Sequence, residues 1–133
     1  MPGRLGNSDI ITFIAGEAIT ALQAVAIHSN GKVVLANGAS GQRVDGIAQR
    51  DAASGDAVEV VVFGRTKALA GTTLTAGTNS LLMVEQTSAR LIPWTNASGT
   101  EYSVARVIFN QNVTSYADGD EIEVIFTGAS QFA

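Results

Sequence analysis

The residues best suited to binding a metal ion form one acidic run, Asp-Gly-Asp-Glu-Ile-Glu, at 118–123. Calcium takes about six to eight oxygen ligands, and EF-hand loops space them as D-x-D-x-D-G with a distant glutamate. Only Asp118 and Asp120 fit that spacing. Glu121 and Glu123 alternate with apolar residues, which places them on the solvent face of a β-strand. The run therefore predicts a turn that leads into a strand, and no metal site.

Cysteine and histidine supply many catalytic nucleophiles and bases, and the chain has no cysteine and one histidine, His28. A zinc site would have to be dominated by carboxylates, and a Ser-His-Asp arrangement would have to use His28. That residue lies beside a predicted hairpin turn. The glycine-rich stretches 38–46 and 71–79 lack the sequence and the strand–helix context of a phosphate-binding loop. We therefore predict a protein that is not an enzyme, with no catalytic, metal-binding or cofactor-binding residues.

A pattern of twelve residues occurs twice, as ASGDAVEVVVFG at 53–64 and as ADGDEIEVIFTG at 117–128. Six positions are identical, and β-branched residues occupy several positions between them. Three explanations are open: a duplicated module, a repeated binding loop, and chance recurrence of a common β-turn. The repeated binding loop is the weakest of these, because the spacing matches no catalytic or phosphate-binding motif.

The elements around these residues have strand patterns. The stretch 24–38 predicts a hairpin with a type I′ turn at Asn30-Gly31, a pair that readily takes positive φ. Residues 79–94 predict a second hairpin that turns at 86–88, with Pro93 on an edge strand and a short helical turn as the alternative.

Three further stretches alternate in hydrophobicity with the period of a strand: 56–64, 102–110 and 120–128. In the last of these, Ile122, Val124 and Phe126 should face inward. Short strands separated by glycine-rich turns predict an all-β fold, a small β-sandwich or barrel.

The domain organisation follows from the recurrence of these patterns. Three elements occur in the same order in the halves 13–66 and 67–128, which favours a duplicated β module and an internal pseudo-repeat. We expect a single β domain over 10–133. Residues 1–9, MPGRLGNSD, show no periodicity and are rich in glycine and polar residues, so we expect a flexible, extended N-terminal arm.

Composition and charge restrict the classes of partner. Charged residues make up 15% of the chain, against about 25% in a typical soluble domain, so we expect much of the surface to be covered by other subunits. The formal net charge is −4, and no basic stripe that could neutralise nucleic-acid phosphates is present. The apolar stretch 10–27 is interrupted by Glu17 and other polar residues, which argues against a membrane span or a signal peptide. We expect no nucleic-acid or membrane partner, and synthesis in a reducing cytoplasm.

Residues 14–64 combine four features: an Ala-Gly entry, a G-x-V hairpin, a G-I-A strand, and a G-D-x-V-x-V segment that leads to a glycine. In this combination the chain resembles the decoration, or cement, proteins of tailed-bacteriophage capsids, and its second half repeats the pattern loosely. The resemblance implies a small β protein that forms a homotrimer on the outer capsid surface of the virion. It also implies that the protein fastens neighbouring copies of the major capsid protein and so stabilises the head.

Two groups of residues are predicted to make contacts in such an assembly. A flexible arm can add a strand to a neighbour's sheet or become ordered on binding, which makes a set of residues at the N-terminus candidates for contact with the capsid or a neighbour: Pro2, Arg4, Leu5, Ile10 and Phe13. Deleting residues 1–9 should weaken capsid binding and leave the fold intact. Trp94 is a candidate anchor of a subunit interface, and the alternative is a residue at the rim of the core.

Two other functions remain open. The chain could be a different phage structural component, such as the base of a head fibre or a tail protein. It could also be a barrel-sandwich carrier module, which presents a lysine at a hairpin tip, and Lys32 follows Asn30-Gly31. A stable trimer in solution would favour the cement protein, and a covalently modified Lys32 would favour the carrier.

Overall fold

The computed structural model describes residues 8–95 and 99–130, which form β-strands joined by turns and, within those ranges, contain no helix. The prediction of an all-β fold is confirmed. No helix in the described ranges could therefore cross a membrane. The strands are β1 (Asp9–Ile14), β2 (Ala24–Ile27), β3 (Val33–Leu35), β4 (Gly46–Ala48), β5 (Ala57–Leu69), β6 (Leu74–Thr75), β7 (Leu81–Val84), β8 (Leu91–Pro93), β9 (Ser103–Val107), β10 (Ser115–Tyr116) and β11 (Glu121–Ser130).

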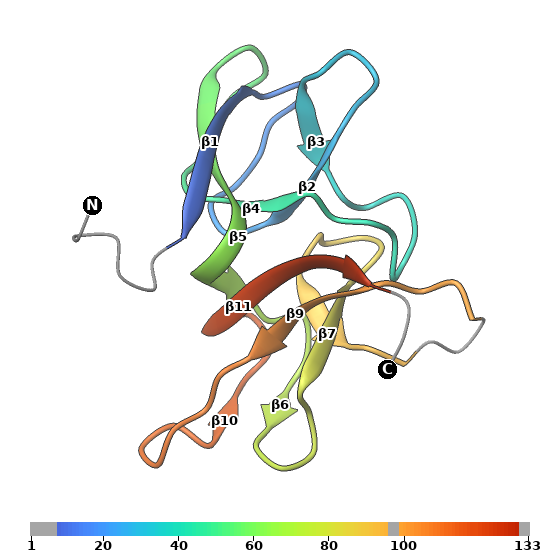
Figure 1. Cartoon of the computed structure of the whole chain (residues 1–133). Coiled ribbons are helices and arrows are strands. Elements are labelled where there is room, and N and C mark those ends of the chain that lie inside the picture. The colour runs from blue at the N-terminus through green and yellow to red at the C-terminus, as the bar shows by residue number, and fades with distance from the viewer. Residues whose placement is uncertain (1–7, 96–98, 131–133) are drawn as a thin grey trace.

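One strongly curled sheet contains all the strands except β6 and β10, which form a small sheet of their own. Its strand order is β3-β2-β4-β5-β11-β9-β7-β8, and β1 pairs with β5 in addition. All of these pairings are antiparallel. Figure 1 shows β1 to β4 gathered around the first part of β5, and the strands from β6 to β11 gathered around its second part. The long strand β5 therefore links two similar halves.

The two halves pair their strands in the same order. In the first half, the hairpin β2–β3 continues through β4 to β5, and β1 pairs with the first part of β5. In the second half, the hairpin β7–β8 continues through β9 to β11, and the last part of β5 pairs with β11. The end of β5 thus occupies the place that β1 has in the first half. Duplication of an ancestral module would produce this arrangement, and it stays a prediction.

Small aliphatic side chains fill two clusters of the core. The cluster of the first half includes Ile19, Val25, Val33, Val58 and Val60, all less than a tenth exposed. A larger cluster lies mainly in the second half and also takes in residues of the first, such as Ile47. The inward side chains predicted for the last strand, Ile122, Val124 and Phe126, are fully buried in this cluster. The larger cluster therefore joins the two halves.

The hairpin β2–β3 is confirmed, but the predicted type I′ turn is wrong. A type I′ turn needs positive φ at two adjacent residues, and only Gly31 has it here, with φ of 84°. The Gly31 N–H donates to the His28 carbonyl at 2.8 Å, and the His28 N–H donates to the Lys32 carbonyl at 2.7 Å. The Asn30 side chain accepts the Lys32 N–H at 2.9 Å. Asn30 therefore stabilises the turn through its side chain and does not adopt positive φ.

The predicted hairpin at 79–94 is also confirmed, since β7 and β8 pair across a turn at 86–88. The Ala89 N–H donates to the Glu85 carbonyl at 3.2 Å, so the connection contains one short helical turn but no helix. Pro93 lies on the edge strand β8. The predicted strand 56–64 is too short, because β5 runs to Leu69. Its last residues, RTKAL, alternate only weakly, and pairing with β11 keeps them extended.

Candidate interaction surface

The twelve-residue pattern forms the same turn in both halves. In the first copy the Ala53 N–H donates to Oδ2 of Asp56 at 3.1 Å. In the second copy the Ala117 N–H donates to Oδ2 of Asp120 at 2.8 Å. The glycine before each aspartate has positive φ, 94° at Gly55 and 90° at Gly119, which a residue with a side chain adopts only with strain.

Each turn also donates a backbone hydrogen bond to a residue near the start of its own half. The Gly55 N–H donates to the Ala15 carbonyl at 2.8 Å, and the Gly119 N–H donates to the Ala70 carbonyl at the same distance. Because the two aspartates bind backbone within their turns, their carboxylates serve a structural purpose. The repeated residues alone were sufficient to identify both turns from the sequence.

Removing either aspartate should therefore destabilise the protein to a similar degree. We expect Asp56→Ala and Asp120→Ala each to lower the free energy of unfolding by about 1 kcal/mol, the usual net value of one hydrogen bond. Urea unfolding measures both. Asp118→Ala is the control, since its exposed carboxylate only reaches Arg90 at 3.6 Å and should contribute less than about 0.5 kcal/mol. A large loss at one turn and none at the other would show that the turns are not equivalent.

The carboxylates of the acidic run 118–123 do not converge on a metal site. Glu123 pairs with Arg65 at 2.7 Å and Glu121 lies 4.0 Å from Lys67. The hydrogen bond that the Arg65 guanidinium donates to Glu123 raises the pKa of Arg65 above its ordinary value. Within the described residues no three potential ligands form a cluster. The outward face of β11 is therefore an ion-paired surface, and the predicted turn followed by a strand is confirmed.

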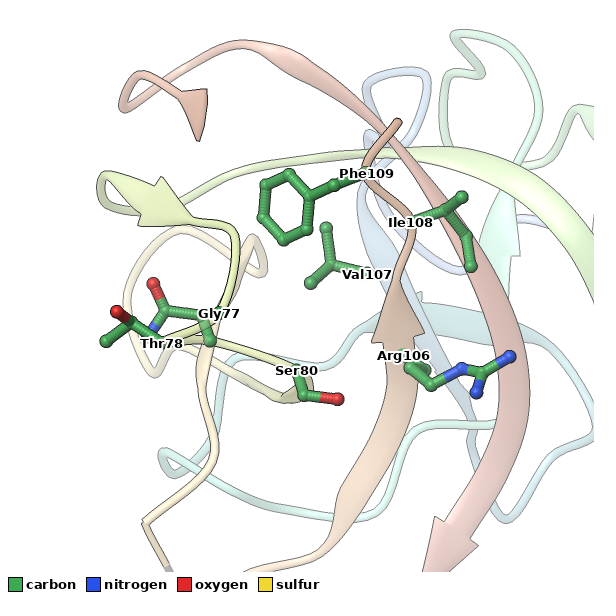
Figure 2. Close-up of a pocket in the computed structure, with 8 residues that line it drawn as sticks. Gly77, Thr78, Ser80, Arg106, Val107, Ile108 and Phe109 are labelled. Carbon is green, nitrogen blue, oxygen red and sulfur yellow. The ribbon is translucent and has the colours of Figure 1, made fainter. Parts of the chain in front are cut away.

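A hollow of about 420 Å³ lies between the loop 77–80 and the end of β9. Figure 2 shows Val107 and Phe109 turned toward the loop, whereas the guanidinium of Arg106 extends away from it. Arg106 is the one ionisable side chain in the lining. The hollow thus offers neither a base beside a nucleophile nor a set of metal ligands, and it gives no basis for a catalytic proposal.

The most unusual surface of the described chain is an apolar face over β1 and the first part of β5. Its exposed side chains are Ile10 and Ile14 on β1 and Phe63 on β5, which are 55%, 42% and 55% exposed. We call these three residues the β1 face. In the register, Ile10 lies opposite Val61 and Ile14 opposite Ala57, so they project on the side of the sheet that carries Phe63. Large apolar side chains are common singly at surfaces, whereas a cluster marks a contact site.

The opposite side of the same strand pair belongs to the core. Val58 and Val60 are buried in the first-half cluster, and Val62 and Phe13 pack against it. The strand DIITFI is therefore apolar on both sides. On the core side the fold covers Phe13 and leaves Ile11 49% exposed, whereas Ile10 and Ile14 on the other side lie outside the core. Glu59 is the charged residue on the β1-face side of β5, and it binds Arg50 at 2.6 Å. That hydrogen bond lowers the pKa of Glu59, so the pair remains ionised and neutral overall at pH 7.

The structure separates the residues that the sequence nominated for contacts. Pro2, Arg4 and Leu5 lie outside the described residues. Ile10 belongs to the β1 face, whereas Phe13 packs against the first-half cluster of its own chain. The structure adds Ile14 and Phe63, which sequence reasoning missed. Their signal was present: Ile14 follows Ile10 at the spacing of a strand, on a strand with apolar residues on both sides.

Trp94 lies far from β1 in the sheet order, whereas Lys32 lies beside Gly16, two residues after the end of β1. Trp94 follows the edge strand β8 and is partly buried, and its indole N–H donates to the Glu101 carbonyl at 3.1 Å. This bond satisfies the one polar group of the side chain within its own chain, and a role of Trp94 in an interface stays a prediction. Lys32 is exposed beside the β2–β3 turn, where a carrier lysine would lie, and its modification stays untested.

The comparisons with known proteins show a shared fold. The structure matches the head fibre gp8.5 N base of bacteriophage phi29 with a TM-score of 0.63 and 16% sequence identity. The match covers 93% of this chain and 98% of that one. No protein-family model and no curated protein matches the sequence. At this identity the likeness is one of fold.

Proposed function

We propose that the chain is a non-enzymatic structural protein of a tailed-bacteriophage head, which attaches to the outer surface of the capsid as a homotrimer and stabilises it. The observation that carries the proposal is the fold shared over nearly the whole chain with a head fibre base. The G-D-x-V-x-V segment at 55–60, which resembles cement proteins and recurs loosely as G-D-x-I-x-V at 119–124, supports the same placement independently of the fold match.

Surface chemistry supports a role in assembly over a role in catalysis. The only ionisable side chain in the hollow beside β9 is Arg106, and the acidic run of β11 is engaged by basic residues of β5. The β1 face, in contrast, exposes apolar area that water solvates poorly. In an assembled shell, neighbouring protein subunits can cover such a face.

The decisive experiment is binding to purified heads of the parent phage that lack the protein. We expect the added chain to sediment with the heads and to appear as trimeric density on the outer surface in electron microscopy. A cement protein should also raise the temperature at which heads release DNA. Heads that bind no protein would contradict the proposal, and density only at the tail would move the protein to another part of the virion.

A head-fibre base is the second candidate, because the fold match is to such a base. A base anchors a fibre, whereas a cement protein reinforces the shell between capsid subunits. Head stability separates the two: a base should bind the head without changing the temperature of DNA release. Projections beyond the density of this domain in native virions would also favour the base.

Removal of the N-terminal arm should weaken head binding. The arm was predicted at 1–9, but strand β1 begins at Asp9 and the Ser8 hydroxyl donates to the Arg65 carbonyl, so deletion of residues 1–7 keeps β1 and this contact. We expect at least a tenfold loss of affinity for heads, equivalent to about 1.4 kcal/mol, with an unchanged melting temperature. Co-sedimentation over a concentration series measures the affinity. Unchanged affinity would exclude a role of the arm in attachment.

A further inference from the structure

The two halves of the chain allow their surfaces to be compared strand by strand. In the first half, β1 pairs with β5 so that Ile10, Thr12 and Ile14 lie opposite Val61, Glu59 and Ala57. In the second half, β5 pairs with β11 so that Arg65, Lys67 and Leu69 lie opposite Ile125, Glu123 and Glu121. Counted back from the Ala-Gly pair that follows each strand, at Ala15 and Ala70, the two registers correspond residue by residue. Ile10, Thr12 and Ile14 are thus equivalent to Arg65, Lys67 and Leu69.

This correspondence provides an internal reference for what the surface of such a strand pair looks like in water. On the second-half surface, the positions equivalent to Ile10 and Thr12 are Arg65 and Lys67, and both are well exposed. They pair with Glu123 and Glu121 across the strands. The first-half surface has the same backbone geometry, yet Ile10, Thr12 and Ala57 stand in place of Arg65, Lys67 and Glu121, and only Glu59 keeps the charge of its equivalent, Glu123. The backbone pairing is compatible with either kind of side chain, so the difference in side chains points to a difference in what covers the two surfaces.

A second observation concerns how the first half is already covered. Ile47 on β4 lies opposite Val61, on the side of the sheet that carries the β1 face, and it is fully buried in the larger cluster. The second half of the chain thus covers this side of the sheet over β4. The cover does not extend to Ile10, Ile14 and Phe63. The β1 face is therefore the uncovered continuation of a buried surface.

We propose that the β1 face is covered by the same face of further copies of this chain, packed around a rotation axis. Six large apolar side chains of the described residues are exposed: Ile10, Ile11, Ile14, Ile27, Phe63 and Leu81. Three of these, Ile10, Ile14 and Phe63, form the β1 face, whereas Ile11 lies on the other side of β1 and Ile27 and Leu81 are on other strands. Another copy of the chain therefore offers its largest apolar surface only at its own β1 face, and contact between like patches requires a symmetry axis that passes near them.

Charge favours the same occupant. The chain carries a net charge of −4, so copies repel one another on average. At the β1 face the acidic Glu59 is already neutralised by Arg50 at 2.6 Å, and two such faces can approach without placing unpaired like charges together. Association through the ion-paired face of β11 would instead have to displace water from four charged groups. The proposed contact between β1 faces rests on the proposed function only for the three-fold order of the axis.

The test is the mass of the full chain in solution, measured by sedimentation equilibrium and native mass spectrometry. We expect the wild-type chain to be an oligomer, and Ile10→Arg and Ile14→Arg to reduce its mass to that of one 13.7 kDa chain. Leu69→Arg is the matched control, because Leu69 is the second-half equivalent of Ile14 and lies opposite Glu121. It should leave the oligomer intact. Melting temperatures of all variants establish that each is folded.

Three results would overturn the inference: a monomeric wild-type chain at high micromolar concentration, equal dissociation by Leu69→Arg, or folded Ile10→Arg and Ile14→Arg variants that remain oligomeric. If those two variants kept the mass of the wild type and lost head binding, the β1 face would contact the capsid instead. The proposed function is tested separately. A chain that associates through this face and binds no heads would retain the inference and lose the function, and a monomer that binds heads would do the reverse.

Discussion

Truncating Phe126 should lower the stability of this protein more than truncating any exposed residue. Its ring is the largest fully buried side chain among the described residues, and it lies within the cluster that joins the two halves. Phe126→Ala removes that apolar area and leaves a cavity among Leu, Val and Ala side chains that cannot collapse completely. We expect the free energy of unfolding to fall by about 3–5 kcal/mol. Urea unfolding at one fixed protein concentration measures it, since self-association adds to stability.

Phe63 provides a control of the same residue type in the same sheet. It is 55% exposed on the β1 face, so Phe63→Ala should change the stability of the single chain by no more than about 0.5 kcal/mol. Its effect should appear in self-association instead. If the two phenylalanines gave equal losses of chain stability, the assignment of Phe126 to the core and Phe63 to a contact surface would be wrong.

Replacing Gly46 by alanine should destabilise the protein more than a single methyl group usually does. An added Cβ at Gly46 would lie 2.2 Å from Cγ1 of Val60 and 2.7 Å from the backbone oxygen of Val61. Both distances are shorter than any van der Waals contact, and the second involves the backbone of β5, which cannot rotate away. Strand β4 would have to move from β5. We expect a loss of about 1–3 kcal/mol, the usual cost of overpacking a tight site, together with a lower melting temperature.

Gly38→Ala is the matched control for this substitution. Gly38 lies in a loop, and an added Cβ there meets only the Oε1 atom at the end of the Gln42 side chain, at 3.0 Å. That atom accepts the Gly38 and Ala39 N–H groups and needs to move by only a few tenths of an ångström, so the cost should stay below about 1 kcal/mol, the usual net value of one hydrogen bond. Equal losses at Gly38 and Gly46 would point to a general effect of removing glycine, through the unfolded chain, and would contradict a clash between β4 and β5.

Local patterns predicted much of the fold because the signals for strands and turns are short in range. Alternation along 120–128 identified the buried side of the last strand, and Ile122 and Phe126 are fully buried there. The hairpin at 79–94 followed from a polar turn between two apolar runs. In the repeated turns, Asp56 and Asp120 each accept a hydrogen bond from the backbone N–H of the residue three positions earlier. In each case the deciding interaction lies within a few residues of the signal.

The failures concern choices that depend on distant parts of the chain. Asn30-Gly31 is compatible with more than one hairpin turn, and the pairing of β2 with β3 selected the one in which only Gly31 has positive φ. The segment 65–69 has a weak strand pattern of its own. It is extended because β11, more than fifty residues later, pairs with it.

The sequence alone determined that this is an all-β protein, with hairpins at 24–38 and 79–94 and a turn that occurs twice. Spacing and side-chain type are sufficient for these features, because backbone hydrogen bonds and alternation act between near neighbours. Only the tertiary structure decided which side of DIITFI the chain covers. Both sides of that strand are apolar, and covering one of them depends on where β5 and the second half come to lie. Ile10 and Ile14 remain outside that cover, and this is why the surface for assembly became visible only in the folded chain.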